Sequence, residues 1–166
     1  MNYATMSSLV TFAAVFAATY ALHPAADHWV QTQNQADHKG CDPDHGTGRH
    51  QHCSTRRSRW YCVKHVATYG LTQLAGIAVL VAAFGLRLSP LSLTVGMAIN
   101  LGTHYLADRR VPFRAIAERL GSGGFYQLGL PRAGRDDNPS LGTGAYALDQ
   151  SWHIAFLFFS AVVIAL

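Results

Sequence analysis

Charged residues are missing from four long segments of this chain, and this feature limits its fold more than any other. Each segment has roughly the 18 to 20 residues that a helix needs to cross the hydrocarbon layer of a bilayer. No strict alternation of polar and apolar residues favours strands instead. Asp, Glu, Lys and Arg are absent from residues 5–22, 66–86 and 88–105, and residues 149–166 contain only Asp149.

The sequence therefore predicts an all-α, polytopic membrane protein with four transmembrane helices and two polar cytoplasmic loops. Its length of 166 residues favours a single domain, 1–166. Pro24 is expected to kink the first span, and Ser89 followed by Pro90 favours the start of a helix. The predicted spans cover about residues 8–30, 60–86, 90–108 and 146–166.

The basic residues lie almost entirely on one side of the predicted membrane. Cytoplasmic loops are enriched in Lys and Arg, so both long loops are predicted to be cytoplasmic and both termini outside, in the inner (cytoplasmic) membrane of a cell. The net charge of +4 is then a signal of orientation, and no nucleic-acid partner is expected. The loop residues that carry this signal are Lys39, Arg49, Arg56, Arg57, Arg59, Lys64, Arg109, Arg110, Arg114, Arg119, Arg132 and Arg135, with Arg87 alone on the other side.

The first span has an alternative interpretation, in which residues 9–22 form the apolar core of a cleavable signal. Such signals begin with a basic region, and the leading segment MNYATMSS has no charged side chain. A retained span is therefore preferred.

The two long loops differ in composition. Residues 31–59 are polar and contain His and Cys, whereas residues 109–145 combine a basic amphipathic segment with a Gly-rich connector. Cytoplasmic thiols stay reduced, so a Cys41–Cys53 disulfide is expected only if the topology is inverted. The first loop also fits an irregular zinc site, and a solvated loop without a specific ion is the alternative. Its possible ligands are Cys41, His45, His50 or His52, and Cys53.

Imidazole and carboxylate side chains recur at the predicted cytoplasmic ends of all four spans. Residues four apart share a helix face, and the first and third spans both carry the pattern HxxxD. These two spans run inward and the other two run outward, so the polar residues of all four reach one depth. Ionisable groups within spans are costly and usually face the interior of the bundle. The set comprises His23, Asp27, His65, His104, Asp108, Asp149 and His153.

This set predicts a site for a divalent metal, with zinc as the first expectation and manganese as the second. It exceeds what one tetrahedral ion needs, so either two ions share the site or some carboxylates orient the histidines. Asp27 or Asp108, where it is not a ligand, would act as a general base. The alternative is that these residue types occur here only because they suit helix ends at a membrane interface. Polar neighbours that would support the ligands or bind substrate phosphate are Gln31, Lys64, Asn100, Arg109, Arg110 and Gln150.

The order of these residues resembles a family of small bacterial and phage integral-membrane proteins that is described only as a domain of unknown function. The likeness extends over about residues 23–153, with residues 40–59 standing apart as an insertion. It is carried by HxxxDxxxQ followed by Lys39, by a histidine at the start of the second span, and by THYLAD and LDQSWH. The resemblance supports the residue set and implies no particular reaction.

A looser likeness is to membrane-bound metal-dependent hydrolases, and beyond them to helical zinc phospholipase C and P1-type nucleases. These enzymes bind zinc with HxxxD or HxxxE pairs, which the two HxxxD pairs of this chain would match. The soluble enzymes also use an N-terminal tryptophan as a ligand, which has no equivalent at Met1, and Pro24 interrupts the first pair. This likeness implies hydrolysis by analogy alone.

We expect a membrane-embedded metal-dependent hydrolase that acts on a phosphate ester of a lipid or polyprenyl carrier, with its His/Asp site at the cytoplasmic face. One alternative is a small metal-ion or proton transport element, which would need polar residues that continue to the outer face. Another is a non-enzymatic membrane protein, such as a phage-encoded effector, that binds a host protein through its basic loops.

Overall fold

The structure of the chain, a computed structural model, describes residues 2–42, 54–129 and 143–166. Every regular element within these ranges is helical. The elements in chain order are α1 (Tyr3–Ala25), the π-helical turn η1 (Ala26–Val30), α2 (Gln33–His38), α3 (Thr55–Phe84), α4 (Pro90–Asp108), α5 (Val111–Arg119), α6 (Gly123–Tyr126) and α7 (Gly144–Ala165).

The four long helices begin at side chains that cap them. Asn2, Ser54, Ser89 and Thr143 each precede a long helix, and each side chain accepts a hydrogen bond from a backbone N–H in the first turn. Such caps satisfy donors that have no partner within the helix. α3 ends at Gly85, whose φ of 64° is a left-handed conformation that suits glycine. The short connector to Ser89 then makes α3 and α4 a hairpin, and α4 begins at Pro90 as predicted.

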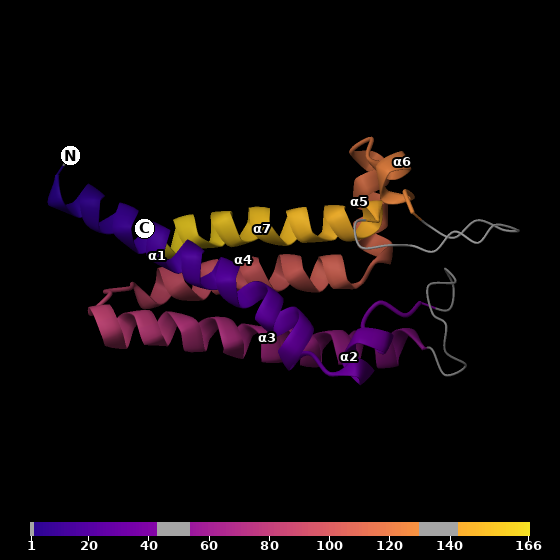
Figure 1. Ribbon diagram of the computed structural model, residues 1–166, viewed down its shortest axis with the longest axis horizontal. Helices are drawn as coiled ribbons and strands as arrows, with labels where there is room; N and C mark the ends of the chain where they lie inside the picture. Colours follow the sequence, from indigo (N-terminus) through magenta and orange to yellow (C-terminus); the bar gives the residue numbers. More distant parts are fainter. Residues whose placement is uncertain (1, 43–53, 130–142) are drawn as a thin grey trace, which may run out of the picture.

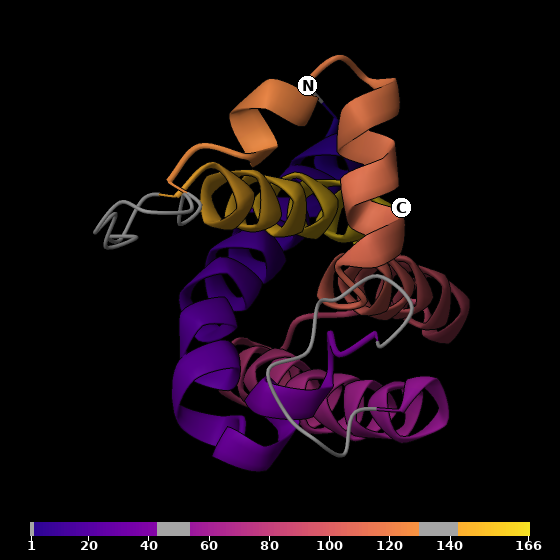
Figure 2. The same cartoon turned by 90° about the vertical axis from the view of Figure 1, so that its right-hand side faces the viewer.

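α1, α3, α4 and α7 pack as a ring. α4 contacts α7, α7 contacts α1, α1 contacts α3, and α3 contacts α4. Figure 1 shows both termini toward one end of this bundle and α2, α5 and α6 at the opposite end. Figure 2, turned by 90°, shows the four long helices around a shared centre. Successive long helices therefore run in opposite directions, which brings the ends of α1 and α4 beside the beginnings of α3 and α7.

Three stretches, α1 with η1 (Tyr3–Val30), α3 and α7, are long and apolar enough to cross a membrane. Large apolar side chains on these helices face outward, and Leu71, Val79 and Phe159 are 67%, 63% and 53% exposed. Polar side chains are buried on the same helices instead. An apolar exterior around a polar interior is typical of a protein whose surface is covered by lipid.

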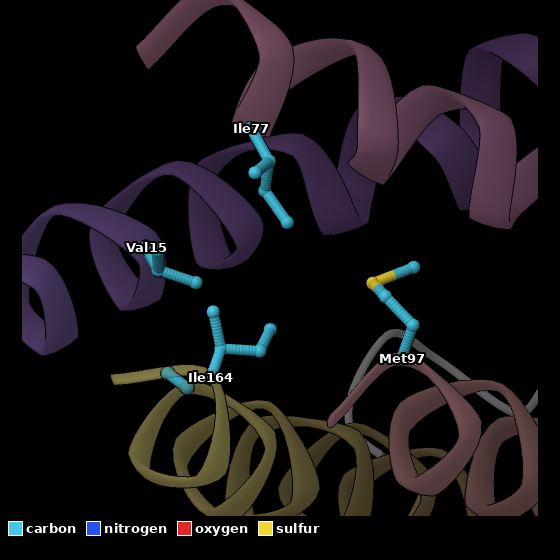
Figure 3. Close-up of a cluster of buried hydrophobic side chains, with 5 residues drawn as sticks. Val15, Ile77, Met97 and Ile164 are labelled. Carbon is cyan, nitrogen blue, oxygen red and sulfur yellow. The ribbon is translucent and has the colours of Figure 1, made fainter. Parts of the chain in front are cut away.

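An apolar cluster fills the bundle on the side of the termini. It consists of Val15, Ile77, Met97, Ala161 and Ile164. Figure 3 shows Val15, Ile77, Met97 and Ile164 approaching one another from the four long helices. Each lies 7 to 12 residues from the histidine of its own helix, which corresponds to roughly 10–18 Å along a helix axis. The apolar cluster and the histidines therefore occupy different levels.

α4 and α7 approach closely because Gly96 has no side chain. A Cβ atom at this position would lie 2.4 Å from Cγ1 of Ile164 and 2.9 Å from the carbonyl oxygen of Ser160. The Ser160 hydroxyl donates a 2.8 Å hydrogen bond to the Gly96 carbonyl. Small residues permit this kind of contact between membrane helices.

The segments at the polar end differ in part from the sequence predictions. The region predicted as a polar loop at 31–59 contains α2, which a capping box at Thr32 begins, and also the first turns of α3. The irregularity expected at Pro24 takes the form of η1, in which the Gln31 N–H bonds the Ala26 carbonyl five residues back. The predicted basic amphipathic segment contains α5, which buries Phe113 and Ala117.

Candidate metal centre

Each long helix contributes one histidine to a single buried cluster. His23 comes from α1, His65 from α3, His104 from α4 and His153 from α7, and none is more than 3% exposed. The ring centroids lie 5.2 Å apart for His65 and His104, 4.2 Å for His104 and His153, and 4.9 Å for His23 and His153. The structure thus brings together the four histidines that the sequence predicted to share one level.

Two of these histidines meet two carboxylates at nearly equal distances. Nε2 of His65 lies 3.1 Å from Nε2 of His104, 3.1 Å from Oδ1 of Asp27 and 3.2 Å from Oδ2 of Asp108. Nε2 of His104 lies 3.3 Å from each of the same two oxygens. We call these four residues, His65, His104, Asp27 and Asp108, the central tetrad.

Five of the six separations within the central tetrad are close to those between neighbouring ligands of a tetrahedral ion. Zinc bonds to His nitrogen and Asp oxygen measure roughly 2.0–2.2 Å, so neighbouring ligand atoms on a tetrahedron lie about 3.3–3.5 Å apart. The five contacts above, at 3.1–3.3 Å, are close to that spacing. Overlapping sets of three from this region also satisfy the proximity expected of metal ligands: His23, Asp27 and His104; His65, His104 and Asp108; and Asp108, Asp149 and His153.

Hydrogen bonds alone leave the central tetrad incomplete. Oδ1 of Asp27 and Oδ2 of Asp108 are buried without a hydrogen-bond partner, although both face two imidazole nitrogens. A proton shared between the two nitrogens would still leave both oxygens without a hydrogen bond, and a buried acceptor without one is costly. A divalent cation bound by these imidazole nitrogens would supply the positive partner that the oxygens lack, so the residue types present fit such an ion.

The other two histidines are oriented by partners behind them. Nδ1 of His153 lies 2.7 Å from the carbonyl oxygen of Asp149, and Nδ1 of His23 lies 3.3 Å from the hydroxyl of Tyr69. That hydroxyl in turn donates to Oδ1 of Asn100 at 3.3 Å. Metal-binding histidines usually use their second nitrogen in this way.

Tyr69 and Lys39 belong to the site, although neither was among the predicted site residues. The Tyr69 ring packs 3.9 Å from the ring of His104. The ammonium of Lys39 lies 2.7 Å from Oδ1 of Asp108, and this ion pair is buried, with the Lys39 side chain 12% exposed. The sequence had assigned Lys39 to the charge signal of the first loop and to the family resemblance, but not to the site. The position of Tyr69 four residues after His65 was an available signal, because both lie on one helix face.

The remaining predicted residues have varied surroundings. Asp149 sits at the edge of the cluster, with Oδ2 3.5 Å from Nδ1 of His153 and 3.2 Å from Nε2 of Gln150. Oε1 of Gln31 is buried without a hydrogen-bond partner. Lys64 is exposed, and its ammonium lies 5.2 Å from the centre of the Trp60 ring, away from the cluster.

Arg109 ties the polar end of the bundle together. It is buried, and its Nη1 donates to the Lys39 carbonyl at 3.0 Å and to the Ser58 hydroxyl. These bonds join the end of α4 to the residue after α2 and to the start of α3. In this conformation Arg109 supports the backbone at Lys39, whereas we had expected it to bind substrate phosphate.

The predicted loop site falls mostly outside the described residues. The possible ligands outside the described residues are His45, His50, His52 and Cys53. Cys41 is buried and disulfide-bonded, so its sulfur is not available as a zinc ligand here. The described free thiol belongs to Cys62, which contacts the Tyr105 carbonyl at 3.7 Å.

The centre is a closed, ligand-rich site at one end of an apolar bundle. Its histidines and carboxylates could hold a divalent cation, and Lys39, the residue after α2, directs its ammonium to Asp108. Comparison with known proteins adds no relative, since no family model, no curated protein and no solved structure matches the chain.

Proposed function

We propose that this chain is a membrane-embedded, metal-dependent hydrolase whose ion is held by the central tetrad. The observation that carries the proposal is the meeting of two imidazole nitrogens and two carboxylate oxygens at 3.1–3.3 Å. We assign zinc first, because it prefers four ligands of this kind, and manganese second. We also propose that α4 crosses the membrane as a fourth span, since it completes the ring with α3 and α7.

The chain's own residues have separate tasks in this proposal. A bound divalent ion would lower the pKa of a water molecule and polarise a phosphoryl oxygen. Asp27 and Asp108 hold the ion, because each directs an oxygen into the central tetrad. Asp149 is the better candidate for accepting a proton, since its side chain is 28% exposed while those of the other two acids are 8% and 5% exposed.

The surroundings support a phosphate ester of a lipid or polyprenyl carrier as the substrate. The bundle exposes an apolar surface, so a lipid chain would reach the site from the side. Separate from the central tetrad, a hollow of about 630 Å³ at the start of α3 is lined by Arg56, Arg57, Arg59 and Trp60. Guanidinium groups favour phosphate oxygens, and tryptophan favours the headgroup region of a membrane.

Two observations bear on sidedness and point in opposite directions. The Lys and Arg residues of both loops favour a cytoplasmic site in the inner membrane. The disulfide at Cys41 is instead typical of an oxidising compartment and is the state expected for the inverted topology. We retain the cytoplasmic orientation as the proposal, because the charge signal involves 12 of the 13 basic residues.

The test combines metal content with phosphate release. The protein would be purified in detergent with His45, His50 and His52 replaced by alanine in every sample, so that the loop cannot contribute ions. We expect bound zinc by elemental mass spectrometry, and release of inorganic phosphate from lipid phosphates that chelation stops and zinc restores. His65→Ala with His104→Ala should abolish both, whereas His28→Ala, an exposed histidine of η1, should change neither.

Full metal content in the double variant would refute the central tetrad as the site. Metal binding without phosphate release from any lipid phosphate, in protein with His65 and His104 intact, would refute the hydrolase.

A further inference from the structure

We propose that the centre binds two ions, with the carboxylate of Asp27 as a bridge between them and with His23 and His153 as ligands of the second ion. This inference rests on the proposed metal centre and adds a second site beside it. It gives a role to His23 and His153. The four residues of the central tetrad would already fill the positions around a single tetrahedral ion.

The two oxygens of Asp27 face different histidines. Oδ1 belongs to the central tetrad, at 3.1 Å from Nε2 of His65 and 3.3 Å from Nε2 of His104. Oδ2 lies 3.5 Å from Nε2 of His23. A carboxylate that presents one oxygen to each of two ligand groups is the arrangement of a bridging ligand, and metal pairs in hydrolytic sites commonly lie about 3.5–4 Å apart.

His153 presents a lone pair to the centre. A carbonyl oxygen can only accept a hydrogen bond, so the 2.7 Å contact with the Asp149 carbonyl places the proton of the neutral ring on Nδ1. Nε2 then carries the lone pair. This atom is buried without a hydrogen-bond partner, and His153 is 3% exposed.

The same reasoning applies to His23. The Tyr69 hydroxyl donates to Asn100, so its oxygen is available to accept from Nδ1 of His23. Nε2 of His23 is left with its lone pair toward Asp27, again buried without a hydrogen-bond partner. A lone pair opposite a carboxylate oxygen is repulsive unless a cation lies between them.

A second ion on the other side of the centre, among Asp108, Asp149 and His153, has less support. Oδ1 of Asp108 is already paired with Lys39 at 2.7 Å. Oδ2 of Asp149 already accepts a hydrogen bond from Gln150 at 3.2 Å. Nε2 of His23 and Nε2 of His153 are instead both buried without a hydrogen-bond partner, and the two rings lie 4.9 Å apart.

The experiment loads the full-length chain in detergent with Mn²⁺, which is visible by electron paramagnetic resonance. The loop variant with alanine at 45, 50 and 52 serves as the parent. We expect two Mn²⁺ per chain by elemental mass spectrometry, and the multiline spectrum of two exchange-coupled ions. His23→Ala with His153→Ala should retain one Mn²⁺ and show the spectrum of an isolated ion, whereas the matched control His28→Ala should behave as the parent.

Each outcome separates this inference from the proposed function. One Mn²⁺ per chain in the parent, or two without exchange coupling, would overturn the bridge and leave the central tetrad intact. No bound Mn²⁺ and no bound Zn²⁺ in the parent would overturn both. These measurements on the parent decide the matter even if the double variant does not fold.

Discussion

Lys39→Met gives a sensitive test of how the charge on Asp108 is balanced. The substitution preserves the length of the side chain and removes the ammonium that lies 2.7 Å from Oδ1 of Asp108. The Asp108 side chain is only 5% exposed, so its carboxylate would lose a partner that water cannot replace. Removing one member of a buried ion pair typically destabilises a protein by about 3–5 kcal/mol. At roughly 2–4 °C per kcal/mol for a chain of this size, the melting temperature should fall by about 6–20 °C.

The stability that Lys39→Met loses should depend on whether the metal is bound. With zinc bound, Oδ2 of Asp108 contacts a cation through the central tetrad, so we expect less than half of the destabilisation measured with chelator. The assay is thermal unfolding in detergent, followed by circular dichroism, with and without zinc. Lys64→Met is the matched control, because Lys64 is an exposed lysine packed over aromatic rings, and it should shift the midpoint by less than about 2 °C in either condition.

Two results would refute this reasoning. An equal fall in melting temperature with and without zinc would mean that the ion does not balance the charge of Asp108. An unchanged melting temperature in the chelated sample would mean that the ammonium of Lys39 does not stabilise the buried carboxylate of Asp108.

Three further predictions concern the packing, the support of His23 and the topology. Gly96→Leu should destabilise the bundle by about 1–3 kcal/mol or more, because even a Cβ there would lie 2.4 Å from Ile164, whereas Gly102→Leu, with open space around it, should cost little; thermal unfolding measures both. Tyr69→Phe should weaken binding of the second Mn²⁺ about 10- to 100-fold in a metal titration while the first is retained, since it removes the partner of His23; equal weakening of both ions would contradict this. Alkaline phosphatase fused to either terminus should be active if the termini lie outside, and inactivity at both would establish the inverted orientation that the disulfide suggests.

The helices and the level of the site were predictable because both depend on regular periodicity. Uncharged length marks the spans, and a spacing of four residues places His104 and Asp108 on one face. The alternating direction of the spans then brings such pairs to one end of the bundle. α4 begins at Pro90 and ends at Asp108, as the sequence predicted.

Helical periodicity does not encode contacts between separate elements, so the sequence did not predict them. Lys64 directly precedes His65 in the chain, but consecutive helical residues point about 100° apart, and Lys64 faces outward. Lys39, which does reach the site, follows the separate helix α2, so its approach to Asp108 depends on how that helix folds back. η1 shifts the register after Pro24 by a π-helical turn, which the proline alone does not specify.

The apolar cluster of Val15, Ile77, Met97, Ala161 and Ile164 packs between the histidines and the end of the bundle that carries the termini. These five side chains carry no charge, and the thioether of Met97 is their one weak acceptor. Access to the histidines from the polar end alone would make bound metal sensitive to chelator from one face of sealed vesicles. Sensitivity from both faces would favour the transport alternative.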